Sequence, residues 1–355
     1  MSERDSGPGL ERRDLLKLGA AAAAGILTRD LAAEAIKDAP APAPPSPHNP
    51  RTAGAMPMRN LGRTGFRVGL FSLGGQAAVE KPDNEELAIP IIEKALDLGA
   101  NYIDTSARYG GEARWSERYI GQVMKRRRSE AFLATKTHDR TRGGSWKLLE
   151  TSLRLLNTRQ VDLWQIHNLT SKEQVDRIFA PDGAVKAMEE AREQKLVRFL
   201  GVTGHADPDV LLEALRRFPF DTILMALNAA DPHHRSFQTK LLPTAVEKEM
   251  GIIGMKIPAR GRILYSWRPP APGSEPAWTG TATGPGTLTM PEAMRYVLSL
   301  PVSTIIIGCD SVSQVEENVT IARAFTPLSG PQLADLQKKA EPVKRQALFF
   351  RPWEA

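Results

Sequence analysis

Cysteine is nearly absent from this sequence, since Cys309 is the only one among 355 residues. A single cysteine excludes both an intrachain disulfide and a cysteine-rich metal site. The sequence also lacks a G-x-G-x-x-G motif opening a helix after the first predicted strand, which an open dinucleotide-binding sheet normally carries. The pair His233-His234 has no carboxylate or cysteine at a metal-binding spacing. We therefore predict no metal site, and we interpret this pair and Arg235 as polarity at the surface or on the substrate side.

A strong excess of either charge is also lacking, since 47 Lys and Arg residues against 41 Asp and Glu residues give a net charge of +6. One local basic run, at residues 125–128, is typical of a solvated helix end. Without interleaved aromatic residues or a nucleic-acid module, the sequence predicts no nucleic-acid partner. Hydrophobic residues make up 41% of the chain, enough at this length for a core without disulfides.

The N-terminal segment, residues 1–38, resembles a twin-arginine signal peptide. Arg12 and Arg13 precede an alanine-rich stretch that ends near Leu27, shorter than the roughly 20 apolar residues of a membrane span. We expect the twin-arginine (Tat) export machinery to carry the protein to the periplasm or cell envelope, without a stable membrane span. The protein would be cytoplasmic if the signal does not function, and a frayed amphipathic helix is the alternative interpretation. Residues 39–55, rich in proline and alanine, are predicted to be an extended linker.

The remaining residues, 56–355, alternate short apolar runs with amphipathic segments. The runs are mostly continuous, which is typical of parallel strands covered on both faces. Eight strands are predicted, at residues 69–73, 102–104, 132–135, 163–166, 199–202, 222–227, 251–255 and 304–307. Helices are predicted at residues 89–98, 146–156, 184–194, 209–217, 241–249, 291–298 and 313–324. This repeated strand–helix order predicts an α/β fold, a parallel eight-stranded (β/α)8 TIM barrel.

Three further segments flank the predicted barrel. A Gly-containing turn at residues 61–65 predicts a short N-terminal hairpin. Residues 331–343 predict a C-terminal helix, followed by an aromatic tail that folds back on the barrel. Residues 267–289, rich in Pro, Gly and Thr, lie between strand seven and its helix. Loops at that end of a barrel carry function, so this segment is either a lid or a surface insertion.

Four polar residues lie at the carboxyl ends of three successive predicted strands. Asp104 and Tyr109 follow the second strand, Lys136 the third and His167 the fourth. Each alone has an ordinary explanation, as a helix cap, a packing side chain, a solvated cation or a satisfied polar residue. Because the carboxyl ends of barrel strands converge on one mouth, their joint occurrence predicts a single proton-transfer site.

Several stretches that carry these residues resemble the aldo-keto reductase family. They are Y-I-D-T-S-A-R-Y-G at 102–110, A-T-K at 134–136, D-L-W-Q-I-H-N at 162–168, V-T-G at 202–204 and I-G-C-D-S-V-S-Q-V-E-E-N at 307–318. They span almost all of the chain after residue 56, and the leader suggests an exported bacterial branch. The resemblance implies an NAD(P)-dependent oxidoreductase that reduces a small aldehyde or ketone to an alcohol, or catalyses the reverse.

The resemblance assigns a role to each of the four residues. Tyr109 would be the general acid that protonates the developing alkoxide. A free phenol has a pKa of about 10, and Lys136 beside it is expected to lower that pKa. Asp104 is expected to pair with Lys136, and His167 to orient the carbonyl oxygen. On the substrate side we expect Trp115 and Asn168.

The resemblance also implies where NADPH or NADH would bind. The adenine end is expected near strand eight, at a loop and helix N-terminus where backbone N–H groups favour a phosphate. The expected contacts there are Gly308, Asp310, Ser311, Gln314, Glu317 and Asn318. Many NADPH-dependent relatives have an Arg where this chain has Asp310. Because a carboxylate repels a 2′-phosphate, the sequence leans toward NADH.

The nicotinamide end departs from the family pattern at three positions. Leu224 stands where relatives often have a Gln that holds the carboxamide. Thr203 stands where a Ser-Asn pair is common, so it is expected to hold the amide alone. Lys256 stands where many relatives have an aromatic residue that stacks on the ring, and we expect it to contact a phosphate.

Two other functions are compatible with parts of this pattern. A barrel aldolase would use Lys136 as a Schiff-base nucleophile, but it would leave Asp104, Tyr109 and residues 308–318 without a role. A cofactor-binding regulatory barrel with little turnover would be favoured by the loss of one of the four core residues. All four are present.

Overall fold

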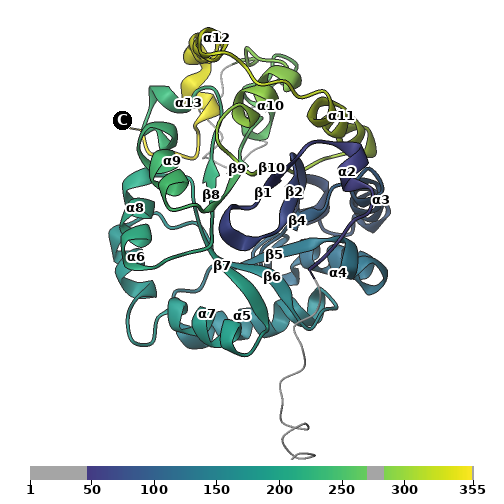
Figure 1. The fold of residues 1–355 in the computed structure, drawn as a ribbon, viewed down its shortest axis with the longest axis vertical. Coiled ribbons are helices and arrows are strands. Elements are labelled where there is room, and N and C mark those ends of the chain that lie inside the picture. Colours follow the sequence, from purple (N-terminus) through teal and green to yellow (C-terminus); the bar gives the residue numbers. More distant parts are fainter. Residues whose placement is uncertain (1–45, 270–283, 354–355) are drawn as a thin grey trace, which may run out of the picture. The chain divides into compact units, whose positions relative to one another are not determined.

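The computed structural model describes residues 46–269 and 284–353. Within these ranges eight parallel strands close into a barrel, in the ring order β10-β3-β4-β5-β6-β7-β8-β9 (Figure 1). They are β3 (Phe71–Gly74), β4 (Tyr102–Asp104), β5 (Phe132–Thr137), β6 (Val161–Ile166), β7 (Val197–Gly204), β8 (Thr222–Ala226), β9 (Gly251–Met255) and β10 (Thr304–Ile307). Every one overlaps a predicted strand, which confirms the (β/α)8 barrel.

Helices alternate with the strands and surround the barrel in Figure 1. They include α3 (Glu85–Asp97), α4 (Trp115–Arg127), α5 (Arg142–Leu155), α6 (Lys172–Ile178), α7 (Ala184–Glu193), α8 (Pro208–Arg217), α9 (Phe237–Glu247), α10 (Met290–Leu298), α11 (Val312–Arg323), α12 (Gly330–Ala340) and α13 (Lys344–Ala347). α6 was not predicted as a helix, and of α4 only the basic end at residues 125–128 was. The buried face of α4 contains Ser116, Glu117 and Gly121 beside apolar residues, so its apolar periodicity is weak.

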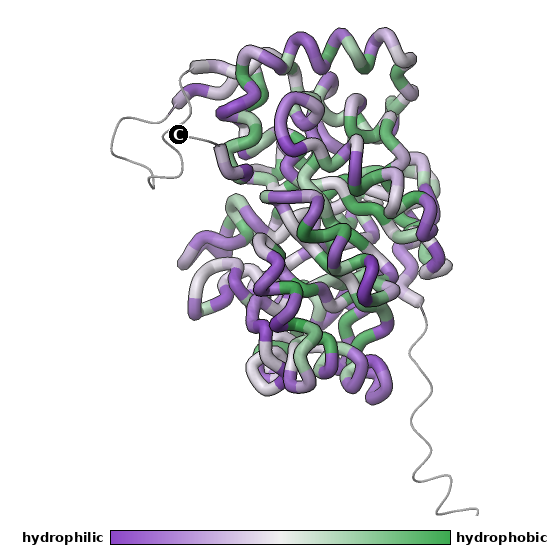
Figure 2. The backbone as a smooth tube through the Cα atoms, turned by 90° about the vertical axis from the view of Figure 1, so that its left-hand side faces the viewer, coloured by the Kyte–Doolittle hydropathy of each residue, from purple (hydrophilic) through white to green (hydrophobic). Residues whose placement is uncertain are grey.

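Apolar side chains fill both the inside of the barrel and the space between barrel and helices. In Figure 2 the apolar parts of the chain lie mainly toward the centre and the hydrophilic parts on the outside. The predicted hairpin is present as β1 (Met58–Asn60) and β2 (Arg67–Gly69), paired antiparallel. Phe66 in this hairpin packs against Phe132 at the start of β5, with ring centroids 4.6 Å apart. The hairpin therefore plugs the amino end of the barrel and leaves the carboxyl end for chemistry.

The folded domain begins before the boundary predicted at residue 56. Residues 46–55, assigned above to the linker, form one unit with the barrel and include the short helix α2 (Thr52–Ala55). Asn49 is buried, and its side-chain amide donates to the carbonyl oxygens of Leu96 and Ala100 at 2.8 and 3.1 Å. These bonds satisfy carbonyl groups at the end of α3. The proline-rich composition of residues 39–55 gave no reason to expect such contacts. The predicted signal peptide and the linker up to residue 45 lie outside the described residues.

The C-terminal segment folds back on the barrel as predicted, and the cluster at 233–235 holds it there. His233 Nε2 lies 2.9 Å from the carbonyl oxygen of Gln337, and His234 stacks on Trp353 with centroids 3.7 Å apart. Arg235 forms an ion pair with Asp207 at 2.8 Å. The three side chains are exposed or half-buried, as expected of surface polarity, and the two histidines in addition contact the C-terminal segment.

Residues 270–283 of the predicted insertion lie outside the described residues. The residues that flank them return to the barrel, where the N–H groups of Gly286 and Leu288 donate to Leu264 and Ile263. None of the helices in the described part of the chain has the length and apolarity needed to cross a bilayer.

Candidate active site

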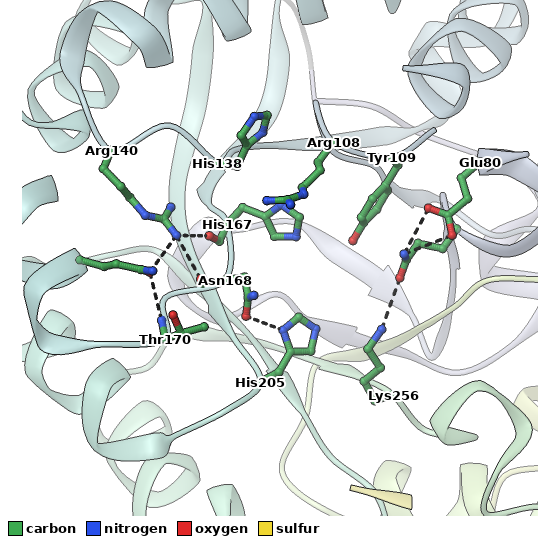
Figure 3. A pocket seen from close by; sticks show the side chains of 12 residues that line it. Glu80, Arg108, Tyr109, His138, Arg140, His167, Asn168, Thr170, His205 and Lys256 are labelled. Carbon is green, nitrogen blue, oxygen red and sulfur yellow. Dashed lines mark hydrogen bonds between the residues drawn. The ribbon is translucent and has the colours of Figure 1, made fainter. Parts of the chain in front are cut away.

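The four predicted catalytic residues meet at the carboxyl end of the barrel. Asp104 is the last residue of β4, Lys136 lies near the end of β5, and His167 directly follows β6. Tyr109 comes from the loop after β4 and reaches back over the mouth (Figure 3). Because β4, β5 and β6 are neighbours in the barrel, parallel pairing places their ends together. The prediction of one site from three strand ends therefore has a direct geometric basis in this structure.

Lys136 is the centre of this group. Its ammonium donates to the carboxylate of Asp104, to the carbonyl oxygen of Thr105 at 2.7 Å and to the hydroxyl of Tyr109 at 3.4 Å. The side chains of Lys136 and Asp104 are each 1% exposed. Gln165, on β6, donates to the other carboxylate oxygen of Asp104 at 3.2 Å. A buried ion pair is retained only where such additional hydrogen bonds satisfy it, and here they hold the ammonium under the phenol.

The pKa of Tyr109 differs from the sequence-based expectation. Burial raises it well above the usual value, and the negative charge of Asp104 raises it further. Lys136 was expected to lower this pKa, but its charge is balanced by Asp104 at contact distance. The phenol therefore keeps its proton at neutral pH. A developing alkoxide is a stronger base than a phenolate, so a protonated Tyr109 beside it remains able to donate.

The surroundings of His167 keep its imidazole neutral. Burial, followed by the charge of Lys136, lowers its pKa well below the usual value. Its Nδ1 lies 3.0 Å from the hydroxyl of Ser106, which already accepts the backbone N–H of Arg108 at 3.2 Å. When the Ser106 hydroxyl donates to Nδ1, the single proton of the neutral imidazole is on Nε2. A neutral imidazole with Nε2–H can donate a hydrogen bond to a carbonyl oxygen.

A cavity of about 600 Å³ opens beside Tyr109 and His167. Its polar lining is drawn in Figure 3 and comprises Gln76, Glu80, Arg108, Tyr109, His138, Arg140, His167, Asn168, Thr170, Gln174, His205 and Lys256. A neighbouring cavity of about 220 Å³ adds Arg260 and the C-terminal Phe349 and Phe350. Asn168 and Lys256 have φ angles of 51° and 62°, in the left-handed region.

The two predicted substrate-side residues have different surroundings. Asn168 lines both cavities, and its side-chain oxygen lies 2.8 Å from Nδ1 of His205. Trp115 does not line either cavity. Its ring stacks on Tyr119 with centroids 5.6 Å apart and packs against the core between barrel and helices. The substrate contact predicted for Trp115 therefore has no support from these two cavities.

The predicted nicotinamide-side residues lie at the ends of β7, β8 and β9. Lys256 lines the cavity, and its ammonium donates to the amide oxygen of Gln76 at 3.3 Å. The hydroxyl of Thr203 is buried and accepts the backbone N–H of Asn168 at 2.7 Å. Leu224 is buried in the apolar cluster inside the barrel and offers no hydrogen bond. Of these three residues, only Lys256 lines the cavity.

The predicted adenine-side residues lie at the start of α11, away from the cavity lining. Ser311 caps this helix by accepting the N–H of Gln314, and the Gln314 side chain accepts the N–H of Asp310 at 2.7 Å. Asp310 also forms an exposed ion pair with Lys81 at 3.1 Å. Asn318 is buried and donates to Cys309 Sγ at 3.4 Å, while Glu317 is exposed. Gly308 approaches Gln76, since a Cβ there would lie 3.1 Å from backbone atoms of that residue.

Several cavity residues were not among the predicted site residues. Arg108, His138 and Arg140 follow β4 and β5, and His205 follows β7. The same rule that identified the catalytic four, polar residues just after a strand, applies to all of them. T-K-T-H-D-R at 135–140 continues directly from Lys136, but only Lys136 had a counterpart in the family motif.

A closed parallel barrel with a buried Lys–Asp pair, a phenol and a neutral histidine at its mouth defines a barrel enzyme equipped for proton transfer. The chain belongs to the aldo/keto reductase family, whose model matches residues 67–341. It is accordingly an NAD(P)-dependent oxidoreductase of the kind that interconverts carbonyl and alcohol groups.

Individual relatives are distant but match over most of their length. L-galactose dehydrogenase from Arabidopsis thaliana is 28% identical over 311 residues, which are 81% of this chain and 95% of the relative. The holo form of aldo-keto reductase AKR11C1 from Bacillus halodurans matches with a TM-score of 0.64 and 25% identity, covering 80% of this chain and 96% of that one. Glycerol dehydrogenase AKR11B4 from Gluconobacter oxydans shares the fold, with a TM-score of 0.63 at 20% identity over 81% of this chain and 95% of that one.

Proposed function

We propose that the protein reduces the carbonyl group of a small substrate with NADH or NADPH and that Tyr109 donates the proton. The observation that carries this proposal is the contact of the Tyr109 hydroxyl with Lys136 at 3.4 Å, beside Asp104 and above a polar cavity. The reverse reaction, oxidation of an alcohol, would use the same groups in the opposite order.

The nicotinamide supplies or accepts the hydride when it is bound, and the side chains handle the proton and the orientation. Tyr109 passes its proton to the carbonyl oxygen as negative charge develops there. The ammonium of Lys136 stabilises the phenolate that remains, because the two atoms are already in contact. Asp104 fixes the ammonium, and Gln165 fixes Asp104. His167 donates Nε2–H to the same carbonyl oxygen and aligns it with Tyr109.

The residues present fit a nicotinamide dinucleotide. Lys256 lines the mouth with no carboxylate paired to it among the described residues, and Arg260 lines the adjoining cavity. Two cations at the ends of β9 and its loop match the charge of a pyrophosphate. The start of α11, closed by Ser311 and Gln314, would receive the adenine end, with Gly308, Glu317 and Asn318 beside it.

The proposed cofactor preference is NADH. The carboxylate of Asp310 would accept a hydrogen bond from a free 2′-hydroxyl and repel a 2′-phosphate. Lys81 moderates this repulsion, since it pairs with Asp310, but both side chains are more than half exposed and such pairs are weak. Thr203, whose hydroxyl hydrogen is still available, would donate to the carboxamide oxygen in place of the usual pair of residues.

The aldolase alternative fits the geometry less well. A Schiff base requires a neutral, accessible amine. Lys136 is 1% exposed and is held by three acceptors, one of them a carboxylate. The regulatory-barrel alternative predicts weak or absent turnover and is decided by the same experiment as the main proposal.

That experiment is a turnover assay. Purified protein is mixed with NADH or NADPH and a panel of small aldehydes and ketones, and loss of the reduced nicotinamide is followed by its absorbance. Any nucleotide retained through purification is extracted and identified. Turnover with a retained NAD(H) or NADP(H) supports the proposal. Tight nucleotide binding without turnover of any carbonyl would favour the regulatory barrel.

A further inference from the structure

Three nitrogen-rich side chains line the cavity on the β4–β5 side of its mouth. Arg108 comes from the loop after β4, and His138 and Arg140 come from the loop after β5. Figure 3 shows them around His167, on the side away from Glu80 and Lys256. The catalytic roles above use none of the three. The catalytic mechanism therefore does not explain why these three side chains lie together beside the proton-transfer site.

Arg140 is fixed in place by neutral acceptors. Its Nη2 donates to the backbone oxygens of His167 and Asn168 at 2.7 and 3.0 Å and to the Gln174 side chain at 3.1 Å. Its Nη1 is buried and has no hydrogen-bond partner in the described part of the chain. Nδ1 of His138 is also buried and has no hydrogen-bond partner among the described residues. Buried polar groups are almost always paired, and the described residues supply no partner for these two nitrogens.

The positive charge of this group is not balanced by the protein. Within residues 46–269 and 284–353, no carboxylate lies at ion-pair distance from Arg108 or Arg140. Asp139 lies between His138 and Arg140 in sequence, but its carboxylate accepts from the N–H and hydroxyl of Thr141 at 2.7 and 2.6 Å. Burial, opposed by Asp139 and reinforced by Arg108, lowers the pKa of Arg140 to about 10. Two guanidinium groups that face one cavity repel each other, and an anion bound between them would offset this repulsion.

The cofactor is not the obvious anion for this position. In the barrel ring β10 and β6 are four strands apart, so they lie on opposite sides. α11, where the adenine end is expected, follows β10, whereas Arg140 is bonded to the residues that follow β6. Lys256 and Arg260, which suit the pyrophosphate, belong to the loop after β9. Arg108 and Arg140 are left on the substrate side.

We propose that the substrate of this enzyme carries an oxyanion group, and that Arg108 and Arg140 bind it while the carbonyl lies between Tyr109 and His167. The proposal rests on the carbonyl-reductase function above and narrows its substrate class. A planar guanidinium matches the two oxygens of a carboxylate, so aldehyde or keto acids are the simplest members of that class. Arg140 contacts the backbone oxygen of His167 directly, so the anion would sit beside the residue that orients the carbonyl.

The test compares two aldehydes that differ only in charge, 4-carboxybenzaldehyde and its neutral analogue 4-formylbenzamide. Wild-type enzyme with saturating cofactor should reduce the carboxylate with a kcat/KM about tenfold higher at low ionic strength, the size expected for charged hydrogen bonds. The preference should shrink as salt is added. In Arg108→Gln it should fall clearly toward one, because Arg140 is then the only guanidinium left to bind the carboxylate. Arg108 is chosen over Arg140 because the loop that carries His167 depends on Arg140.

Arg154→Gln is the matched control, because Arg154 is an exposed residue in the last turn of α5, at the opposite end of the barrel. It removes the same charge and should leave the preference unchanged. Equal kcat/KM values for the two aldehydes in the wild type would overturn the proposal. So would a preference that survives Arg108→Gln or disappears equally in Arg154→Gln.

A binding measurement separates this proposal from the proposed function. If neither these two aldehydes nor any carbonyl of the panel above is reduced with either cofactor, the reductase function fails. Calorimetric titration with 4-hydroxymethylbenzoate and 4-hydroxymethylbenzamide then still decides the oxyanion site. A roughly tenfold tighter benzoate Kd that is lost in Arg108→Gln supports the site. Equal affinities, or no binding of the benzoate, would exclude it.

Discussion

The ammonium nitrogen of Lys136 lies 3.4 Å from the hydroxyl oxygen of Tyr109. The same ammonium is bonded to Asp104, and both members of that ion pair are almost completely buried. Lys136 therefore cannot move away from the phenol without leaving Asp104 unpaired, which would be costly in the low dielectric of the interior. Because the pair is net neutral, it leaves the phenol protonated in the free protein and stabilises the phenolate only at the moment of proton transfer.

The cofactor preference is tested by Asp310→Arg. Reversing this charge should raise the ratio of kcat/KM for NADPH to that for NADH by about tenfold or more, since repulsion of the 2′-phosphate becomes attraction. Steady-state kinetics with both cofactors measures the ratio. Glu316→Arg makes the same charge reversal on α11, but Glu316 faces Lys94 at 3.2 Å and should leave the ratio unchanged. An unchanged ratio in Asp310→Arg would mean that Asp310 does not face the 2′ position.

Cofactor binding should weaken at alkaline pH through Lys256. Burial, followed by the charge of Arg260, lowers the pKa of Lys256 to about 8. The amine is charged below that pH and neutral above it, so its attraction for a phosphate is lost as pH rises through about 8. The Kd of the dinucleotide should therefore increase between pH 7 and pH 9, roughly with the neutral fraction. Fluorescence titration measures it. Lys256→Arg should remove this pH dependence while keeping tight binding; a wild-type Kd that is constant across this range would contradict the assignment.

The C-terminal segment should contribute strongly to stability through Arg351. Its guanidinium pairs with Asp231 where both side chains are 0% exposed. Asp231 also accepts from the backbone N–H groups of Phe237 and Gln238 at 3.1 and 3.0 Å. Arg351→Met would leave a buried, unpaired carboxylate, at a cost of about 3–5 kcal/mol in the free energy of unfolding. Urea titration measures the change. Arg154→Met, an exposed control, should cost less than about 0.5 kcal/mol; a similar small loss in Arg351→Met would show that the anchor is unimportant.

Export is tested on the full chain with the double variant Arg12→Lys/Arg13→Lys. Twin-arginine signals are read through the arginine pair, so the variant should accumulate in the cytoplasm while the wild type reaches the periplasm or cell envelope. Cell fractionation followed by immunodetection compares the two. Equal amounts outside the cytoplasm would show that the leader is not a twin-arginine signal.

The barrel was predictable because each parallel strand is buried on both faces and therefore reads as an apolar run. Tyr102–Asp104 and Gly251–Met255 were predicted residue for residue. Only the basic end of the helix Trp115–Arg127 was predicted, because the helix buries Ser116 and Glu117. Glu117 accepts a hydrogen bond from Thr135 on β5 at 2.7 Å, a partner distant in sequence that its own periodicity cannot reveal.

The site was predictable to the extent that it depends on strand order. Asp104, Lys136 and His167 end neighbouring strands, so their convergence follows from topology alone. The direction in which the pKa of Tyr109 is shifted does not follow from topology. It depends on how closely the charge of Asp104 balances that of Lys136 in space. The pairing of Arg351 with Asp231 joins residues 120 positions apart and depends on how the tail returns to the barrel. Such long-range polar contacts leave no periodic trace in a sequence.

Tyr109→Phe tests the central claim most directly. The substitution removes only the phenolic hydroxyl, so the reduction rate should fall by at least about 100-fold, as expected for the loss of a general acid. The Kd of the reduced dinucleotide, measured by fluorescence titration on the same preparation, should stay within about twofold of the wild-type value. A Tyr109→Phe variant that reduces the substrate at the wild-type rate would contradict the assignment of Tyr109 as the proton donor.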